Sequence, residues 1–283
     1  MENRQRIAAL ILPSTMLLGL LFVAPLLLMV MLTFRESTFG TTAGAFTLRH
    51  YVEFFTSDAY RWLLWRSFWL SLWVALLTVA LAYPLAYYLV FQAGKHKMTL
   101  LTIIIAPAWV SFLLRILSWK VLLGGSGALA SLLTWLGLLR AGTPVLLYSP
   151  AAVVITLVYV WAPFVALPIF AALERIDHEL HEAAADLGAN QWQTFWRITF
   201  PLSLPGVLAG FLFVFIPTVG EYVTPTLVGG VDGVMIGNII QDQFVRALNW
   251  PFGALMSVVL LLIVLLPLLL LGRFVRLTNL SGL

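Results

Sequence analysis

The chain has 283 residues, of which 61% are hydrophobic and only 10% are Asp, Glu, Lys or Arg. A soluble domain averages about 25% charged residues, so this composition excludes a water-soluble globular protein and indicates that lipid surrounds most of the chain. The formal charge of +4 comes from basic residues scattered between apolar runs, without the basic stripe typical of nucleic-acid binding, and the lack of cysteine excludes disulfides and cysteine zinc sites.

Six apolar segments are long enough to cross a bilayer. A helix needs about 20 apolar residues to span a hydrocarbon core about 30 Å thick. The segments that meet this length lie at about 10–33, 67–91, 99–119, 151–173, 204–224 and 252–272. We therefore predict an all-α, polytopic membrane protein in which residues 1–283 form a single transmembrane domain with about six helices.

The first of these segments begins like a secretory signal, because Arg4 and Arg6 precede the apolar residues 7–32. The apolar core of a signal peptide has only about 7–15 residues, and this run is nearly twice as long. We predict that it is an uncleaved first transmembrane helix.

Three segments, one of them among the six above, depart from the pattern of a simple spanning helix. Residues 128–139 are apolar but too short to span, which is typical of interfacial or buried helices. Residues 234–248 carry apolar side chains at helical spacing among polar ones, which predicts an amphipathic helix on the surface of the protein or the membrane. Glycine and proline interrupt residues 204–224, a pattern tolerated only against neighbouring helices or a cavity.

The orientation in the membrane is only weakly indicated by charge. Six spans place both termini on one side, and the loops on each side share the 16 Lys and Arg residues equally. The basic residues on the side of the termini are denser in short segments, which favours a cytoplasmic location for both termini.

The most charged part of the chain is the loop at 174–203. Its Ala, Glu and Leu content predicts a helix over about 177–187. Gly188 would end this helix in the left-handed conformation that suits glycine. Asn190 and Gln193 then have the spacing of a capping box at the start of a second helix.

The second helix carries an aromatic face. Trp192, Phe195, Trp196 and Thr199 follow one another at the spacing of a single helix face, and we expect Pro201 to end the helix. Such a helix–turn–helix suits either of two roles. It could rest on lipid headgroups, or it could insert its aromatic face into the groove of a partner protein.

A family resemblance favours the second role. The residues that carry it are Glu182, Ala183, Ala184, Gly188, Ile198 and Pro201. They have the spacing of the EAA loop of ABC importer permeases, and only Phe200 departs from that pattern, which has Leu there. In this family the loop is a coupling helix that docks into a cleft of a separate ATPase subunit. The resemblance implies a type I ABC importer permease fold with this loop in the cytoplasm.

Other segments resemble the spermidine/putrescine branch of these permeases. They are SFLLRILSW (111–119), GEYVTPTLVGG (220–230), MIGNII (235–240) and NWPFG (249–253). The resemblance implies a multi-pass protein of the bacterial inner (cytoplasmic) membrane that translocates a polyamine, delivered by a periplasmic binding protein.

The same resemblance implies several partners. The chain has no GxxxxGK[ST] pattern, so it does not bind ATP in the P-loop manner. The family implies two ABC ATPase subunits that use ATP and Mg, and a second permease that is related but different. We expect the chain itself to bind no cofactor or metal and to have no catalytic residues, so that it is a transport subunit rather than an enzyme.

Two ionisable residues near membrane depth are candidates for the substrate path, Arg115 and Glu221. A carboxylate would attract a polyamine, and nearby aromatic rings could add cation–π contacts. The candidate aromatic residues are Trp109, Phe112, Tyr159, Trp161 and Tyr222. Alternatively, Arg115 and Glu221 pair with each other or extend to the interface, and the aromatic residues serve in packing or at the membrane surface.

Two other classes of protein fit less well. Residues 124–127 read GGSG, like the GxSG of intramembrane serine proteases, but the four histidines fall outside the predicted spans, so a glycine-rich turn is the prediction. An ion-driven secondary transporter would show polar ion sites near the bilayer midplane and often an inverted repeat, and neither is clear here. The loop at 182–201 discriminates, because a transporter that works alone needs no docking site for an ATPase.

Overall fold

The computed structural model describes the backbone of residues 2–36 and 45–280, and the side chains of 11–36, 45–265 and 268–269. Helices dominate this part of the chain. Its β structure is an isolated antiparallel bridge between Arg35 and Phe46. The prediction of an all-α protein is confirmed.

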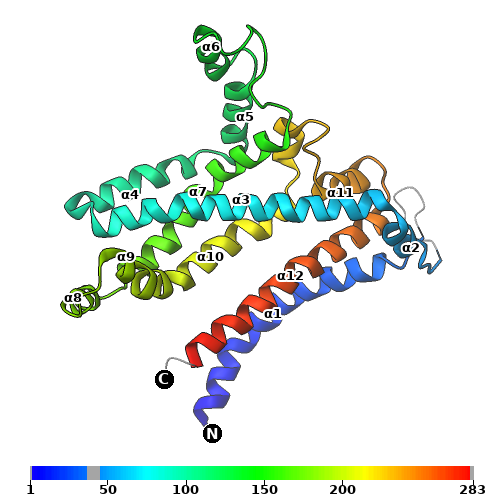
Figure 1. Ribbon diagram of the computed structural model, residues 1–283. Helices are drawn as coiled ribbons and strands as arrows, with labels where there is room; N and C mark the ends of the chain where they lie inside the picture. Colours follow the sequence, from blue (N-terminus) through cyan, green and yellow to red (C-terminus); the bar gives the residue numbers. More distant parts are fainter. Residues whose placement is uncertain (1, 37–44, 281–283) are drawn as a thin grey trace. The chain divides into compact units, whose positions relative to one another are not determined.

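Figure 1 shows the helices of the described residues. In chain order they are α1 (Glu2–Leu32), α2 (Arg49–Thr56), α3 (Asp58–Phe91), η1 (Gly94–His96), α4 (Lys97–Ile105), η2 (Ala106–Trp109), α5 (Phe112–Leu123), α6 (Ala128–Trp135), α7 (Pro150–Glu174), α8 (His178–Asp186), α9 (Gln191–Thr194), η3 (Phe195–Thr199), α10 (Phe200–Val219), η4 (Pro225–Gly229), α11 (Ile236–Val245) and α12 (Trp250–Leu280). The turns η1 and η2 are 3₁₀-helical, whereas η3 and η4 are π-helical.

Five helical segments of the described residues are long and apolar enough to cross a membrane. They are Ile11–Leu32, Asp58–Phe91, Phe112–Trp135, Pro150–Glu174 and Gln191–Val219, and Trp250–Leu265 of α12 is a shorter apolar helix. The polytopic character predicted from the sequence is confirmed, and α12 continues as a helix beyond the predicted end at 272.

The prediction of one continuous helix over 99–119 is wrong. The helix α4 ends at Ile105, the 3₁₀ turn η2 follows, and the backbone is extended at Val110 and Ser111 before α5 begins. Pro107 lies in this break, where it lacks the N–H that would continue the helical hydrogen bonds. The apolar stretch is therefore two short helices separated by a turn.

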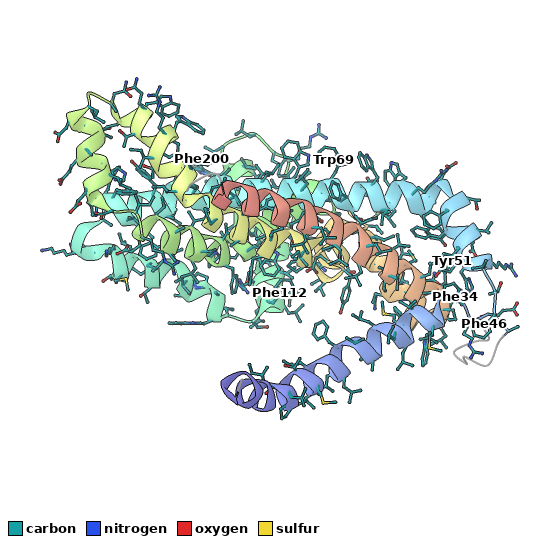
Figure 2. All side chains as sticks on the ribbon, turned by 90° about the horizontal axis from the view of Figure 1, so that it is seen from below. Phe34, Phe46, Tyr51, Trp69, Phe112 and Phe200 are labelled. Atoms are coloured by element: carbon teal, nitrogen blue, oxygen red, sulfur yellow. The ribbon has the colours of Figure 1, made fainter. Side chains whose placement is uncertain are left out.

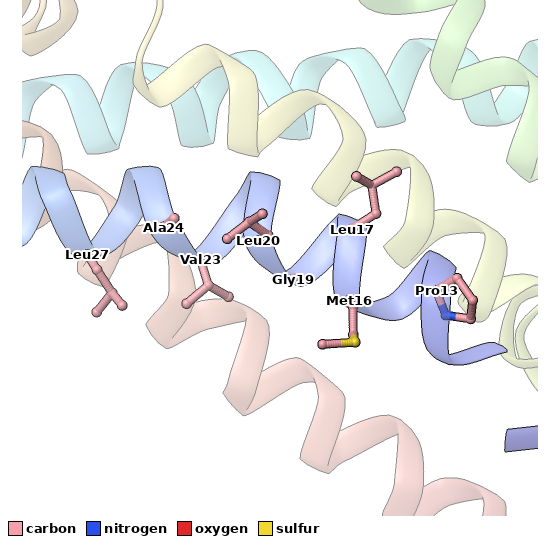
Figure 3. Close-up of a pocket in the computed structure, with 8 residues that line it drawn as sticks. All are labelled: Pro13, Met16, Leu17, Gly19, Leu20, Val23, Ala24 and Leu27. Carbon is pink, nitrogen blue, oxygen red and sulfur yellow. The ribbon is translucent and has the colours of Figure 1, made fainter. Parts of the chain in front are cut away.

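The structure divides into two compact units. The first contains Met1–Trp62 and Ile239–Leu265, and the second contains Leu63–Asn238 and Leu266–Leu283. In the first unit, an apolar groove of about 720 Å³ runs along α1, and all eight of its lining residues come from that helix (Figure 3). Side chains exposed in this way are expected on a helix that faces lipid or another subunit.

In the second unit, α7 and α10 pack unusually closely because glycine lies at their contact. A Cβ atom added to Gly206 would lie 2.5 Å from the Cβ of Ala172 and 2.5 Å from the carbonyl oxygen of Pro168. A Cβ at Gly210 would lie 3.0 Å from Val165 Cγ1. Small residues at such contacts let two membrane helices approach backbone to backbone, which supplies the van der Waals contact that holds them together.

The helix α3 runs alongside α7 and α10 and is joined to its neighbours by buried polar groups (Figure 1). The hydroxyls of Tyr83 and Ser203 form a hydrogen bond of 2.9 Å between α3 and α10. Further along α3, the Oγ of Ser67 accepts a hydrogen bond of 2.8 Å from the backbone N–H of Ile236, at the start of α11. Lipid offers no hydrogen-bond partners, so these two bonds satisfy polar groups that would otherwise be unpaired. They attach α3 to α10 near one end and to the start of α11 near the other.

Candidate functional site

The first candidate site is the helix–turn–helix segment of residues 178–199, formed by α8, α9 and η3. Its first helix begins as predicted, because the Asp177 carboxylate accepts a hydrogen bond of 3.1 Å from the backbone N–H of Glu179. A side-chain oxygen at this position satisfies a backbone donor that has no partner within the helix. The helix α8 is therefore defined locally by its own sequence.

The turn between the two helices is also as predicted. Gly188 adopts a left-handed φ of 81°. Its N–H donates to Ala185 O and the N–H of Ala189 donates to Ala184 O, both at 2.9 Å. This pair of bonds is the Schellman arrangement, which closes the end of a helix and satisfies its last carbonyls.

The capping box at the start of α9 is confirmed. The Asn190 side chain accepts from the backbone N–H of Gln193 at 2.9 Å, and the Gln193 side chain accepts from the N–H of Asn190 at 3.0 Å. Reciprocal bonds of this kind fix the direction in which the second helix leaves the turn. Both helices are thus capped, and the turn between them is rigid.

The prediction that Pro201 ends the second helix is wrong. The backbone continues from α9 through the π-helical turn η3 directly into α10, with Pro201 in its first turn. In this wider turn the N–H of Phe200 donates to Phe195 O, five residues back. Proline is tolerated in a first turn because its missing N–H would have no helical partner there. The fifth spanning segment is therefore one continuous helical segment, Gln191–Val219, in which α10 ends at Val219, whereas the prediction was 204–224.

The single aromatic face predicted for this helix is only partly present. Trp192 and Trp196 are 70% and 49% exposed. Phe195 instead packs against the ring of Tyr83 at 5.8 Å, and Thr199 is buried with its hydroxyl 3.1 Å from His181 Nε2. The π-helical turn adds one residue to the hydrogen-bonded ring, which places Thr199 beneath α8 rather than beside the tryptophans.

Aromatic contacts hold the segment against the end of α3. The ring of His181 lies 5.2 Å from that of Phe91, which in turn lies 4.8 Å from the ring of Tyr87. Beyond α3, Lys97 forms an ion pair with Glu174 at the end of α7. The segment itself is therefore held against α3 and continues directly into α10, while the ion pair joins α4 to α7.

The motif residues of this segment mostly gather around one cavity. A cavity of about 500 Å³ lies between α8 and the second helix, and its lining includes Ala183, Ala184, Gly188 and Ile198. Glu182 is exposed on α8, and Pro201 lies outside the cavity lining. The exposed tip also carries Leu187, 89% exposed. A rigid tip with an exposed carboxylate and apolar side chains has the composition of a docking surface.

The second candidate region follows the other end of α10. Glu221 is 9% exposed, and its Oε1 accepts hydrogen bonds from the N–H groups of Val223 at 2.8 Å and Thr224 at 3.1 Å. The carboxylate therefore stabilises the turn that leads into η4.

A residue that the sequence analysis did not assign completes this region. The amide of Asn238 donates to Tyr222 O at 2.9 Å and to Thr226 Oγ1 at 2.8 Å, and its oxygen accepts from Met235 N at 2.9 Å. Asn238 thus ties α11 to the turn after Glu221. The only signal in the sequence was its polar side chain within the MIGNII segment.

Arg115 is buried elsewhere, with 7% of its surface exposed. Its Nη1 donates to Val160 O at 2.9 Å, and the guanidinium lies 6.0 Å from the ring of Phe164. The alternative that Arg115 pairs with Glu221 is wrong, because each has other partners and no ion pair joins them in the described structure.

The candidate aromatic residues fall into two groups. Phe112 packs against Trp161 with ring centroids 6.4 Å apart, close to Arg115 on the contact between α5 and α7. Tyr159 packs against Trp119 at 5.5 Å. Trp109 and Tyr222 are 79% and 44% exposed. The structure therefore brings Phe112, Arg115 and Trp161 together, whereas Trp109, Tyr159 and Tyr222 are exposed.

Comparison with known proteins shows the family to which the chain belongs. The family described as "Binding-protein-dependent transport system inner membrane component" matches residues 85–279. The spermidine/putrescine transport system permease protein PotB of Escherichia coli K12 is 41% identical over 186 residues, which are 65% of this chain and 67% of that protein. PotB of Salmonella typhimurium SL1344 is also 41% identical over 186 residues, which cover 64% of its own length. The inner membrane ABC transporter permease protein YdcU of E. coli K12 is 34% identical over 184 residues, covering 62% and 58% of the two chains.

Solved structures show the same fold. A chain of a bacterial ABC transporter involved in the import of the acidic polysaccharide alginate matches with a TM-score of 0.75 and 18% identity, over 97% of this chain and 96% of that chain. A chain of the MetNI methionine ABC transporter in an inward-facing conformation matches with a TM-score of 0.55 and 22% identity, over 78% and 98%. The match of the family model to residues 85–279 shows that this multi-pass chain belongs to the family of binding-protein-dependent transport system inner membrane components.

Proposed function

We propose that this chain is the membrane-spanning permease subunit of an ATP-driven ABC importer. The observation that carries the proposal is the helix–turn–helix segment, which is capped at both helices, exposes Glu182 and Leu187 and continues without interruption into α10. A docking element built in this way passes the movement of a partner to a spanning helix. Hydrolysis of ATP with Mg would occur in that partner.

Movement of the segment has two routes into the membrane. One is the continuous helix from Gln191 to Val219, which carries displacement along its axis. The other is the contact with α3, made by Phe195 against Tyr83 and by the hydrogen bond between Tyr83 and Ser203. Because packed helices shift as rigid bodies, a push on the segment is expected to move α3 and α10 together.

We propose a polyamine, putrescine or spermidine, as the solute. The support is the 41% identity to permeases named for spermidine/putrescine transport, together with the carboxylate of Glu221 after α10. The working complex would contain this chain, a related second permease, two ATPase subunits and a periplasmic binding protein, with both termini of this chain in the cytoplasm.

Within this proposal, two groups of residues contribute to the substrate path. Glu221 and Tyr222 form one group, and their backbone is held by Asn238. Phe112, Arg115 and Trp161 form the other on α5 and α7, with Tyr159 packed against Trp119 and Trp109 at the end of η2. Both α5 and α7 pack against η4, the turn that follows Glu221.

The test is purification of the tagged chain from its native membrane in mild detergent, followed by uptake assays in membrane vesicles. We expect an ATPase to co-purify, and we expect labelled putrescine or spermidine to accumulate only when ATP and the binding protein are present. Accumulation driven by an ion gradient without ATP would contradict the proposal and support a secondary transporter.

The role of Glu221 can be tested separately with Glu221→Gln. The glutamine oxygen can still accept from Val223 and Thr224, so the turn is retained while the charge is lost. A charge-assisted hydrogen bond to an ammonium group contributes about 1.5–3 kcal/mol, so we expect the KM for polyamine uptake to rise roughly tenfold or more. An unchanged KM, with Glu221→Ala impaired, would show that the carboxylate only stabilises the turn.

A further inference from the structure

The first unit contains a polar cavity that the proposed transport path does not use. It has a volume of about 210 Å³ and lies beside α2. Its lining consists of Glu36, Thr47, Arg49, His50, Glu53 and Asn249. All six residues belong to the first unit, so the cavity is formed within one compact part of the chain.

The imidazole of His50 is the buried part of this lining. His50 is only 6% exposed, yet neither of its ring nitrogens has a hydrogen-bond partner. Its ring packs 5.6 Å from that of Phe252, which is itself buried beneath Tyr60. Buried polar side chains are nearly always hydrogen-bonded, so an unpartnered imidazole in the wall of a cavity points to a ligand.

The exposed part of the lining carries a net negative charge, because it consists of two glutamates and Arg49. Glu36 and Glu53 are both exposed, and within the described residues neither carboxylate forms an ion pair. Arg49 is the cationic member of the lining, so two carboxylates and one guanidinium give the cavity a net formal charge of −1. A net negative lining that includes an imidazole without a hydrogen-bond partner favours a cation.

The backbone around the cavity is held in place by several contacts. The N–H of Glu36 donates to Ala45 O at 2.9 Å, and the N–H of Thr47 donates to Phe34 O at 2.8 Å. The rings of Phe34 and Tyr51 stack 5.3 Å apart, which joins this two-stranded segment to α2 (Figure 2). Glu36 and Thr47 therefore reach the cavity from a fixed position.

Asn249 reaches the cavity from the other side through a strained turn. Leu248 adopts a left-handed φ of 50°, which is rare for a residue with a side chain and costs about 1–2 kcal/mol. The Asn249 oxygen accepts a long hydrogen bond of 3.3 Å from Phe252 N at the start of α12. Strain of this kind persists where surrounding contacts hold it and is common at binding sites.

The dimensions and chemistry of the cavity select the kind of cation. No group of three or more His, Asp or Glu in the described residues is placed to hold a metal ion. The cavity volume equals that of several water molecules at about 30 Å³ each, which suits a small organic cation. Carboxylate oxygens and an imidazole nitrogen are acceptors, and an ammonium group offers three donors.

We propose that this cavity binds the primary ammonium group at one end of an alkylamine, and that it serves as an outer polyamine subsite. Five of the six lining residues lie in the connection between the first two spans, which the proposed topology puts on the side where substrate arrives. The ligand class rests on the proposed function, whereas the cavity and its acceptors do not.

The experiment uses the full chain in nanodiscs, labelled with ¹⁵N-histidine and titrated with n-butylammonium. We expect the His50 imidazole resonance, identified by its loss in His50→Asn, to move while those of His96, His178 and His181 stay in place. Glu53→Gln, at the exposed entrance, should weaken binding about tenfold. Asp232→Asn removes the same charge from an exposed turn outside the cavity and should leave binding unchanged.

The outcomes separate this proposal from that of polyamine transport. A His50 resonance that does not respond, or equal binding by Glu53→Gln and Asp232→Asn, would overturn the subsite even if vesicles accumulate polyamine. A responding His50 that weakens with Glu53→Gln would support the subsite even if vesicles accumulate no polyamine, in which case only the transported solute would have to be revised.

Discussion

Reversing the charge of Glu182 is expected to abolish transport while leaving the fold intact. Glu182 is exposed on α8 and has no partner among the described residues, so Glu182→Lys removes no internal contact. In a docked complex, however, the lysine would place a positive charge against the partner surface that binds the negative charge of Glu182. Disrupting a charged contact inside a protein interface costs about 2–5 kcal/mol, so we expect ATP-driven uptake to fall roughly 100-fold.

The measurement is uptake in vesicles alongside co-purification of the ATPase. Asp232→Lys is the matched control, because it reverses the charge of an exposed acid in the turn before α11. We expect the control to retain both the ATPase and uptake. If Glu182→Lys retained both as well, α8 would not contribute to docking, and the helix–turn–helix segment would be better explained as a surface that rests on lipid.

Replacing Gly206 with valine is expected to separate α7 from α10. A Cβ at this position would lie 2.5 Å from the Pro168 carbonyl oxygen, and backbone cannot yield as a flexible side chain can. Overpacking a tight core usually costs about 1–3 kcal/mol, and contact with backbone puts Gly206→Val at about 3 kcal/mol. The helices would have to move apart, which would also disturb the hydrogen bond between Tyr83 and Ser203.

Thermal unfolding in detergent measures this effect. The matched control is Gly19→Val on α1, where a Cβ would have no atom within 4 Å. Both substitutions add the same atoms to an apolar helix, and valine has a higher helix propensity than glycine. We expect Gly206→Val to lower the Tm and Gly19→Val to leave it unchanged or slightly raised. Equal Tm values would show that α7 and α10 can separate at little cost.

Features set by local sequence were predicted well. The left-handed Gly188 and the box formed by Asn190 and Gln193 each depend on residues a few positions apart. Hydropathy over some 20 residues likewise predicted most of the spanning helices, with 99–119 the exception, because lipid leaves the backbone few alternatives.

Features set by distant contacts were not predicted. Pro201 was expected to end a helix, but the same residue fits a first turn once the π-helical turn precedes it. The partner of Arg115 is a backbone carbonyl on α7, and a carbonyl carries no sequence signal. His50 and Asn249 are about 200 positions apart in the chain, so no local pattern could indicate their shared cavity.

The π-helical turn at Phe195–Thr199 also determines how this protein can exchange parts with its relatives. Each residue of an α-helix advances the chain by about 100° around the axis, so loss of the extra residue would rotate α8 and α9 by nearly a third of a turn about α10. Trp192 and Glu182 would then face a different direction. A chimaera that takes the helix–turn–helix segment from another permease must therefore exchange residues 178–199 together. The junctions between the two sequences should lie inside α7 and α10.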